Sequence, residues 1–192
     1  MRLPFTPWSR PARAALARPV PPRQGGQALV EFSLILVPFL LIIFGIIQMG
    51  LLFSTQLGLS TAARDSARYA STLITTSASQ ATTNGTNALA DLQAVRLPQY
   101  VIAYTGSNLV TAGTQPTSIT YCQYQNGGSP ATWSIRVRAQ VEYRQVLLLP
   151  LVSILIDGLD GTNDSKFRLG SREEMRVEGL NLKASPAGIP AC

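Results

Sequence analysis

The chain has 192 residues, with 16 lysines and arginines against 10 aspartates and glutamates, for a net charge of +6. It contains no histidine, which excludes Ser-His-Asp triads, histidine general bases and histidine-ligated metal sites. Five arginines precede residue 24 with no acidic residue among them, so the excess positive charge belongs to the N-terminus.

Residues 1–26 form a basic leader rich in Pro, Arg and Ala. Its prolines oppose a stable helix, which disfavours an amphipathic mitochondrial presequence. By the positive-inside rule, the arginines predict that this end stays in the cytoplasm. A nucleic-acid surface is the competing interpretation, but a cut after Gly26 would remove the leader, so no nucleic-acid partner is expected.

Residues 27–53 are predicted to form a transmembrane helix. Between Phe32 and Phe53 the only polar side chains are Ser33 and Gln48, and this run is long enough to cross ~30 Å of hydrocarbon. Pro38 lies inside the run and predicts a kink or a loosened turn, since a membrane helix can satisfy the freed carbonyl locally. A plain single-span anchor that tolerates a proline is the alternative.

A carboxylate stands at the start of this span. Glu31 follows Gln27 by four residues, so the two share a helix face. An ionised glutamate at the edge of hydrocarbon is costly unless it is neutralised. A cut between Gly26 and Gln27 would create an α-amino group one helical turn from Glu31, within a chain or between neighbouring chains.

These residues resemble the processing site of type IV-like prepilins and, more narrowly, TadE-like pseudopilins of the Tad (Flp) pilus system. The resemblance rests on Gly26–Gln27, the Glu31–Phe32 pair, Pro38, and the Ala/Arg segment 62–70. It implies that a prepilin peptidase cuts after Gly26 and that Glu31 and Phe32 set the registry of subunits. It also implies a bacterial inner-membrane protein with a single span, a cytoplasmic N-terminus and a periplasmic head, incorporated into the extracellular pilus in some roles. The implied partners are other Tad pilins and pseudopilins, the inner-membrane assembly platform and membrane lipid.

Beyond the span, residues 54–77 are predicted to continue the helix, with an apolar stripe of mostly small residues. The stripe comprises Leu59, Ala62, Ala63, Ser66, Ala67, Ala70, Leu73 and Ile74. Packing against the chain's own sheet is the plainer interpretation, and packing against another subunit is the alternative. Arg64, Asp65 and Arg68 suit local or cross-subunit ion pairs, or a solvent-facing helix surface.

Residues 78–192 are predicted to form a periplasmic head. Residues 77–87 are predicted to form a loop, and Asn87 to cap a short helix over 88–97 that stops near Pro98. Residues 99–104 leave helix and strand both open.

Strict alternation over 133–144 predicts a half-buried strand, with 118–121 as its hairpin partner and 166–177 as a third strand. The apolar run 146–156 is too short to span a bilayer and is assigned to the core. The fold class is therefore α+β: a long N-terminal transmembrane helix extending into a small head with an antiparallel, pilin-like sheet of three or more strands.

The two cysteines, Cys122 and Cys192, both follow the span and fall in an oxidising compartment if the head is periplasmic. A disulfide between them is expected, and two free thiols are the alternative. The acidic loop 157–164 departs from EF-hand spacing and is interpreted as a solvated turn rather than a calcium site.

Three functions compete. The first is a TadE-like minor pilin or pseudopilin that initiates, caps or anchors a pilus. The second is a single-span, membrane-anchored periplasmic binding or sensor module with an uncleaved anchor. The third, an enzyme, is disfavoured because histidine and the P-loop, Gly-x-Gly-x-x-Gly and Gly-x-Ser-x-Gly motifs are all missing, and no catalytic residue, cofactor or metal is expected.

Overall fold

The computed structural model describes residues 25–128, 130–147, 166–178 and 182–192. The chain divides into two compact units, residues 1–40 and 41–192. The basic leader up to residue 24 and the acidic loop 157–164 lie outside the described residues. Of the apolar run 146–156, only Val146 and Leu147 are described, and Leu147 is buried in the core.

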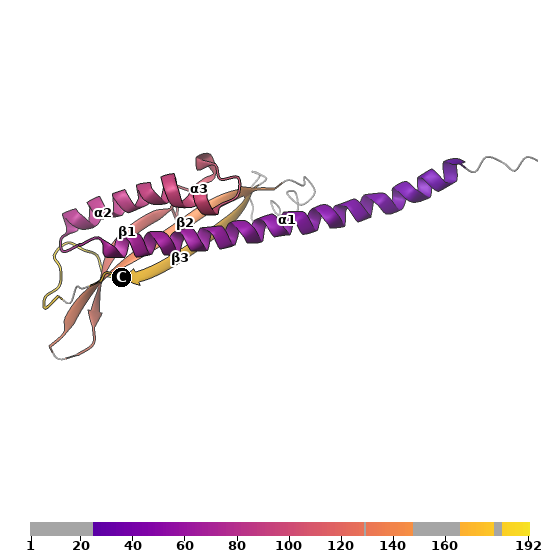
Figure 1. Cartoon of the computed structure of the whole chain (residues 1–192). Helices are drawn as coiled ribbons and strands as arrows, with labels where there is room; N and C mark the ends of the chain where they lie inside the picture. The colour runs from indigo at the N-terminus through magenta and orange to yellow at the C-terminus, as the bar shows by residue number, and fades with distance from the viewer. Residues whose placement is uncertain (1–24, 129, 148–165, 179–181) are drawn as a thin grey trace, which may run out of the picture. The chain divides into compact units, whose positions relative to one another are not determined.

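Helix α1 (Gly25–Thr72) is the long apolar helix expected from the sequence (Figure 1). By length and composition it can cross a membrane, and none of its most apolar 18-residue window is buried inside the protein. Pro38 lies within it, and the helix continues on both sides. The helix ends at Thr72 rather than at 77, so Ile74, predicted to lie on the buried stripe, is 74% exposed.

The segment predicted as a loop over 77–87 is helical, and this prediction was wrong. Helix α2 (Ala78–Asp91) begins after Ser77, whose hydroxyl accepts a hydrogen bond from the Gln80 amide. The Gln80 side chain in turn accepts from the Thr76 amide at 2.9 Å. This reciprocal arrangement is close to a capping box, and it stabilises a helix start that the Ser/Thr/Asn composition concealed. Asn87 therefore lies inside α2 and caps nothing.

The helical chain also runs past Pro98, where the sequence predicted a stop. A π-helical turn, η1 (Leu92–Arg96), follows α2, and the Leu97 amide donates to the Leu92 carbonyl. Helix α3 (Leu97–Tyr100) follows without a break and has Pro98 in its first turn, directly after the π-helical turn. The chain becomes extended at Val101, and a short 3-10 turn, η2 (Gly106–Asn108), leads toward the sheet.

The sheet has the predicted three antiparallel strands, in the order β1 (Ser118–Asn126), β2 (Thr132–Val146) and β3 (Lys166–Arg176). The register pairs Tyr121 with Val137 and Val137 with Met175. On β2 the odd-numbered residues 135–143 are buried, as the alternation predicted. The α+β class is thereby confirmed.

Helix α1 lies along the buried face of the sheet within the larger unit (Figure 1). Near the start of this packing, the Thr55 hydroxyl donates to Gln145 and Gln56 donates to the Gly170 carbonyl. Near its end, the Tyr121 hydroxyl donates to the Ala70 carbonyl. Helix α1 therefore runs antiparallel to β2 and parallel to β3, which distinguishes a proximal end of the sheet, beside Thr55, from a distal end, beside Ser71.

Candidate functional site

The N-terminal end of α1 contains the predicted processing junction. Gly26 lies in the first turn of the described helix, is exposed, and has open space around the position of a Cβ atom. Glu31 is also exposed, one turn after Gln27, and Phe32 beside it is 64% exposed. The two units are separately placed, so these residues are described within residues 1–40 only.

The second half of α1 joins the core of the head through small residues. Leu59, Ala62, Ala63, Ala67 and Ala70 are completely buried and belong to the same cluster as the inner face of β2. The stripe therefore packs against the chain's own domain, which is the plainer of the two predicted interpretations. Alanines permit this close approach because they place little volume between the helix and the sheet.

At Gly58, helix α1 comes close to the backbone of α3. A Cβ atom at this position would collide with the Tyr100 carbonyl oxygen, which is backbone and cannot rotate away. Gly45 and Gly50, which lie earlier on α1, have open space around them within the chain. The three glycines thus separate into one that packs inside the head and two that lie on the apolar stretch.

Asp65 connects α1 to the helices of the head. Its carboxylate accepts a hydrogen bond from the Tyr100 hydroxyl at 2.6 Å and lies 3.9 Å from an Arg96 nitrogen. Arg96 also donates to Asp91 at 3.0 Å. The hydrogen bond to Asp65 raises the pKa of Tyr100, because the bond favours the protonated phenol beside an anion.

Arg64, which precedes Asp65, contacts a different part of the head. Its guanidinium lies 3.7 Å from Glu173 of β3. Arg64 thus contacts β3 and Asp65 contacts α3. Both are contacts within the chain, as the local alternative predicted. These contacts place the end of α1 in a defined orientation on its own domain.

The outer face of the sheet, opposite α1, is rich in arginine. The alternating side chains of β2 and β3 that point away from the core include Arg136, Arg138, Arg144, Arg168, Arg172 and Arg176, with only Glu142 and Glu174 among them as acids. Sequence analysis did not single out this face. The signal was present, because the period-2 pattern that buries residues 135–143 also places every arginine of 133–144 on the other side.

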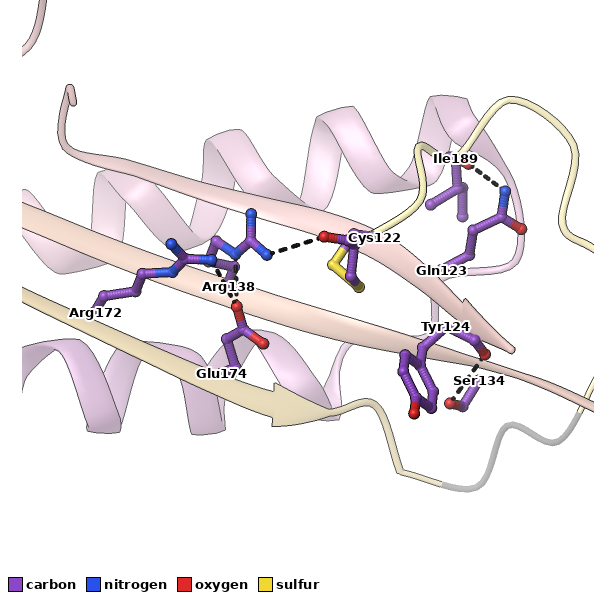
Figure 2. Close-up of a disulfide and its surroundings, with 9 residues drawn as sticks. Cys122, Gln123, Tyr124, Ser134, Arg138, Arg172, Glu174 and Ile189 are labelled. Atoms are coloured by element: carbon purple, nitrogen blue, oxygen red, sulfur yellow. Dashed lines mark hydrogen bonds and ion pairs between the residues drawn. A yellow bond between two sulfur atoms is a disulfide. The ribbon is translucent and has the colours of Figure 1, made fainter. Parts of the chain in front are cut away.

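The two glutamates hold part of this face in place. Arg138 donates to Glu174 at 2.7 Å and Arg172 donates to the same carboxylate oxygen at 2.9 Å (Figure 2). The Arg138 hydrogen bond, followed by the one from Arg172, lowers the pKa of Glu174. At the proximal end, Arg168 donates at 2.7 Å to Glu142, whose side chain is 9% exposed.

The disulfide between Cys122 and Cys192 lies beside these arginines, on β1 (Figure 2). It joins the C-terminal tail to the outer edge of the sheet, and the Cys192 amide donates to the Gln123 carbonyl at 3.0 Å. The Gln123 amide donates in turn to Pro190, so the tail covers the free edge of β1. A bridge over 70 residues stabilises the folded chain by about 4 kcal/mol in the chain-entropy model.

Comparison with known proteins bears on the first of these regions. Residues 26–68 match the family model described as TadE-like protein. This segment is TadE-like. The match confirms the resemblance seen in the sequence, begins at Gly26, and ends at Arg68, so it covers most of α1 and none of the sheet. No curated protein and no solved structure matches the chain.

The TadE-like match concerns residues 26–68, which are less than half of the chain. The family implies a pilin-like protein associated with a Tad pilus, and it is a structural family rather than an enzymatic one. The apolar stretch of α1 agrees with membrane anchoring. Arg64 and Asp65, which hold the head, fall inside the TadE-like segment, whereas the arginine-rich sheet face falls outside it.

Proposed function

We propose that this chain is a minor pilin or pseudopilin of a Tad (Flp) pilus that initiates, caps or anchors pilus assembly after a prepilin peptidase removes the leader. One observation carries the proposal: the TadE-like match starts at Gly26, the residue that would precede the cut. The basic leader, 1–26, would stay in the cytoplasm, the apolar stretch 27–53 would span the inner membrane, and the head, 78–192, would lie in the periplasm.

Cleavage would place a new cation beside Glu31 at the edge of the membrane. The new α-amino group of Gln27 would stand one helical turn from the Glu31 carboxylate, or beside that of a neighbouring copy. Because a charge in hydrocarbon is costly, subunits in which this amine and the carboxylate meet would pack more stably than subunits in which they do not. Glu31 and Phe32 would thus set the registry between subunits, and Pro38 would loosen the helix where it packs.

Charged residues of the TadE-like segment pair with the head, as Arg64 does with Glu173. The partners in this proposal are the prepilin peptidase, other Tad pilins and pseudopilins, and the inner-membrane assembly platform. The competing function is a membrane-anchored sensor or binding module whose anchor is never cut.

The N-terminus of the membrane form tests the proposal directly. The chain is expressed together with a Tad prepilin peptidase and its intact mass is measured. A mature chain that begins at Gln27 is expected, and Gly26→Val should remain full length, because the bulky side chain blocks the cut. Gly25→Ala is the matched control, since it changes the neighbouring glycine to another small residue and should be processed.

Two results would count against the pilin assignment. Wild-type chain that still begins at Met1 in the presence of active peptidase favours the uncleaved sensor module. Normal maturation of the Gly26→Val variant would show that the junction lies elsewhere.

A further inference from the structure

The proximal part of the outer sheet face is hollowed around a buried carboxylate. Two adjoining hollows, of about 250 and 370 Å³, share Glu142 and Gly170 among their lining residues. Arg172 also lines the first hollow, and Arg168 also lines the second. The strand register places Glu142 of β2 directly opposite Gly170 of β3, so both hollows lie over one pair of residues. We call these four residues and the space between them the Glu142 groove.

The carboxylate of Glu142 is only partly satisfied by the protein. Its side chain is 9% exposed, and Oε2 accepts a hydrogen bond from Arg168 at 2.7 Å. Oε1 lies over Gly170, 2.8 Å from the position that a Cβ atom would take there, and accepts no hydrogen bond from the described residues. Because a buried carboxylate is costly unless its remaining lone pairs are also satisfied, Oε1 favours a further donor that comes from outside the chain.

The two arginines of the groove have donors to spare. Arg168 uses Nε to reach Glu142 and is 46% exposed, whereas Arg172 uses one terminal nitrogen to reach Glu174 at 2.9 Å and is 53% exposed. The other nitrogens of both guanidiniums point no hydrogen bond at the described residues. Guanidinium donors match phosphate oxygens well. The groove therefore offers an acceptor for a cation beside donors for a phosphate.

The position of the groove along α1 places it near the end of the apolar stretch. The Gly170 carbonyl accepts a hydrogen bond from the Gln56 side chain at 2.9 Å. Gln56 follows Phe53, the last residue of the predicted span, by three residues, which is about 4.5 Å along a helix. The headgroup layer of a bilayer extends roughly 5–7 Å beyond the hydrocarbon on each side. In a membrane-anchored chain, the groove is thus at the depth of the lipid headgroups.

We propose that the Glu142 groove binds the headgroup of a phospholipid that carries a primary ammonium, such as phosphatidylethanolamine. The ammonium donates to Glu142 Oε1, and the phosphate accepts from Arg168 and Arg172. A quaternary choline has no N–H to donate and is usually held by aromatic rings, which are missing from the described lining of the groove. Phosphatidylglycerol has no cation for the carboxylate. The inference rests on the proposed function for the membrane span, and it adds a specific lipid contact to it.

A series of lipids that differ only at the headgroup nitrogen tests the site. Native mass spectrometry of the full-length chain is carried out in detergent micelles doped with one lipid at a time. The lipids are phosphatidylethanolamine, its monomethyl and dimethyl derivatives, phosphatidylcholine and phosphatidylglycerol, all with the same acyl chains. The N–H donors are lost stepwise from the first lipid to phosphatidylcholine while the phosphate is unchanged. Affinity should fall along this series by about tenfold or more, the usual effect of losing a hydrogen bond to a charged group.

Two variants change the carboxylate in different ways. Glu142→Gln removes its charge, and Gly170→Ala adds a Cβ atom that displaces Oε1, the movable end of a side chain, so the strand itself can stay in place. Each should lose the preference for phosphatidylethanolamine over phosphatidylcholine. The controls are Glu178→Gln, which makes the same charge change at an exposed distal position, and Gly127→Ala, where the space is open. Both controls should keep the preference.

Several results would overturn the site. These are wild type that binds all the lipids equally or prefers phosphatidylglycerol, or Glu142→Gln and Gly170→Ala variants that keep the wild-type preference. Binding of soluble phosphoethanolamine as tightly as the lipid would overturn the membrane source of the ligand. An intact Cys122–Cys192 disulfide and an unchanged circular dichroism spectrum show that each variant is folded.

These outcomes are separate from processing, which is read from the N-terminus. A chain that matures at Gln27 but shows no lipid preference would keep its pilin assignment and lose this site. A chain that still begins at Met1 but prefers phosphatidylethanolamine would keep the site and lose the pilin assignment.

Discussion

At the scale of single residues, the head depends on a few positions where backbone and side chain meet closely. Gly58 lets the backbone of α3 approach α1, and Asp65 accepts the Tyr100 hydroxyl on the same side of the helix. Tyr121 reaches across from β1 and donates to the Ala70 carbonyl at 2.8 Å. These contacts hold a long helix against a small domain without requiring large apolar side chains on the helix.

Replacing Gly58 with alanine should destabilise the head. The added Cβ atom would overlap the Tyr100 carbonyl oxygen, and overpacking of this kind costs about 1–3 kcal/mol. The free energy of unfolding in detergent micelles, measured with urea, checks this expectation.

Gly50→Ala is the matched control, because the space around Gly50 is open and alanine is the better helix former. Equal stability of the Gly58→Ala variant and wild type would show that α1 and α3 are farther apart than the structure places them.

At the scale of elements, local hydrogen bonds decide where helices begin when the hydrophobic pattern is weak. Helix α2 has few apolar residues in its first half and reads as a loop by composition. Its start is set by Ser77 and Gln80, whose side chains and amides satisfy the first turn. Gly85 then allows α2 to approach the Ile119 carbonyl of β1, where an added Cβ atom would lie 2.7 Å from that oxygen.

Removing the cap of α2 should weaken the helix that covers β1. Ser77→Ala is expected to lower the free energy of unfolding by about 1 kcal/mol, the usual effect of losing a serine N-cap. Urea unfolding of this variant is compared with that of Ser79→Ala, which changes an exposed serine within the same first turn. If both variants had the same stability, the Ser77 hydroxyl would not be capping α2.

At the scale of the whole molecule, the chain consists of two units with different features. The first contains Glu31 at the start of an apolar helix, and the second contains a head that orients the end of that helix through Arg64 and Asp65. In the proposed pilus subunit, the helix would provide lateral packing and registry.

Replacing Glu31 with leucine should impair assembly with other pilins and leave membrane insertion intact. Leucine removes a charge that is costly in hydrocarbon, so membrane insertion should be intact, while recovery with partner Tad pilins should fall about fivefold or more through loss of the ion pair. Co-purification of tagged chain from membranes measures both. Ser33→Leu is the control, since it adds comparable apolar surface two residues away, and equal recovery of the Glu31 variant and this control would refute the registry role.

The pattern of residues alone was sufficient for the long helix, the three strands and the α+β class. A long run without charged residues buries its apolar side chains as a membrane-spanning helix, and the strict alternation over 133–144 buries one face of a strand. The cysteine pairing was expected from compartment and number, and the structure places Cys122 and Cys192 4.9 Å apart at Cα. The TadE-like resemblance could also be recognised from the sequence, because the residues that carry it are contiguous around Gly26 and Glu31.

Only the tertiary structure decided which groups meet across elements. The partners of Arg64 and Asp65 come from β3 and α3, far along the chain, and no local spacing indicates Glu173 or Tyr100. The charge of the outer sheet face likewise depends on the register that brings Arg136 opposite Arg176. The periodicity of apolar residues indicates which side of a helix or strand is buried, so the buried faces could be predicted from the sequence. Which side chains meet across elements depends on how all the elements pack together, so these contacts could not.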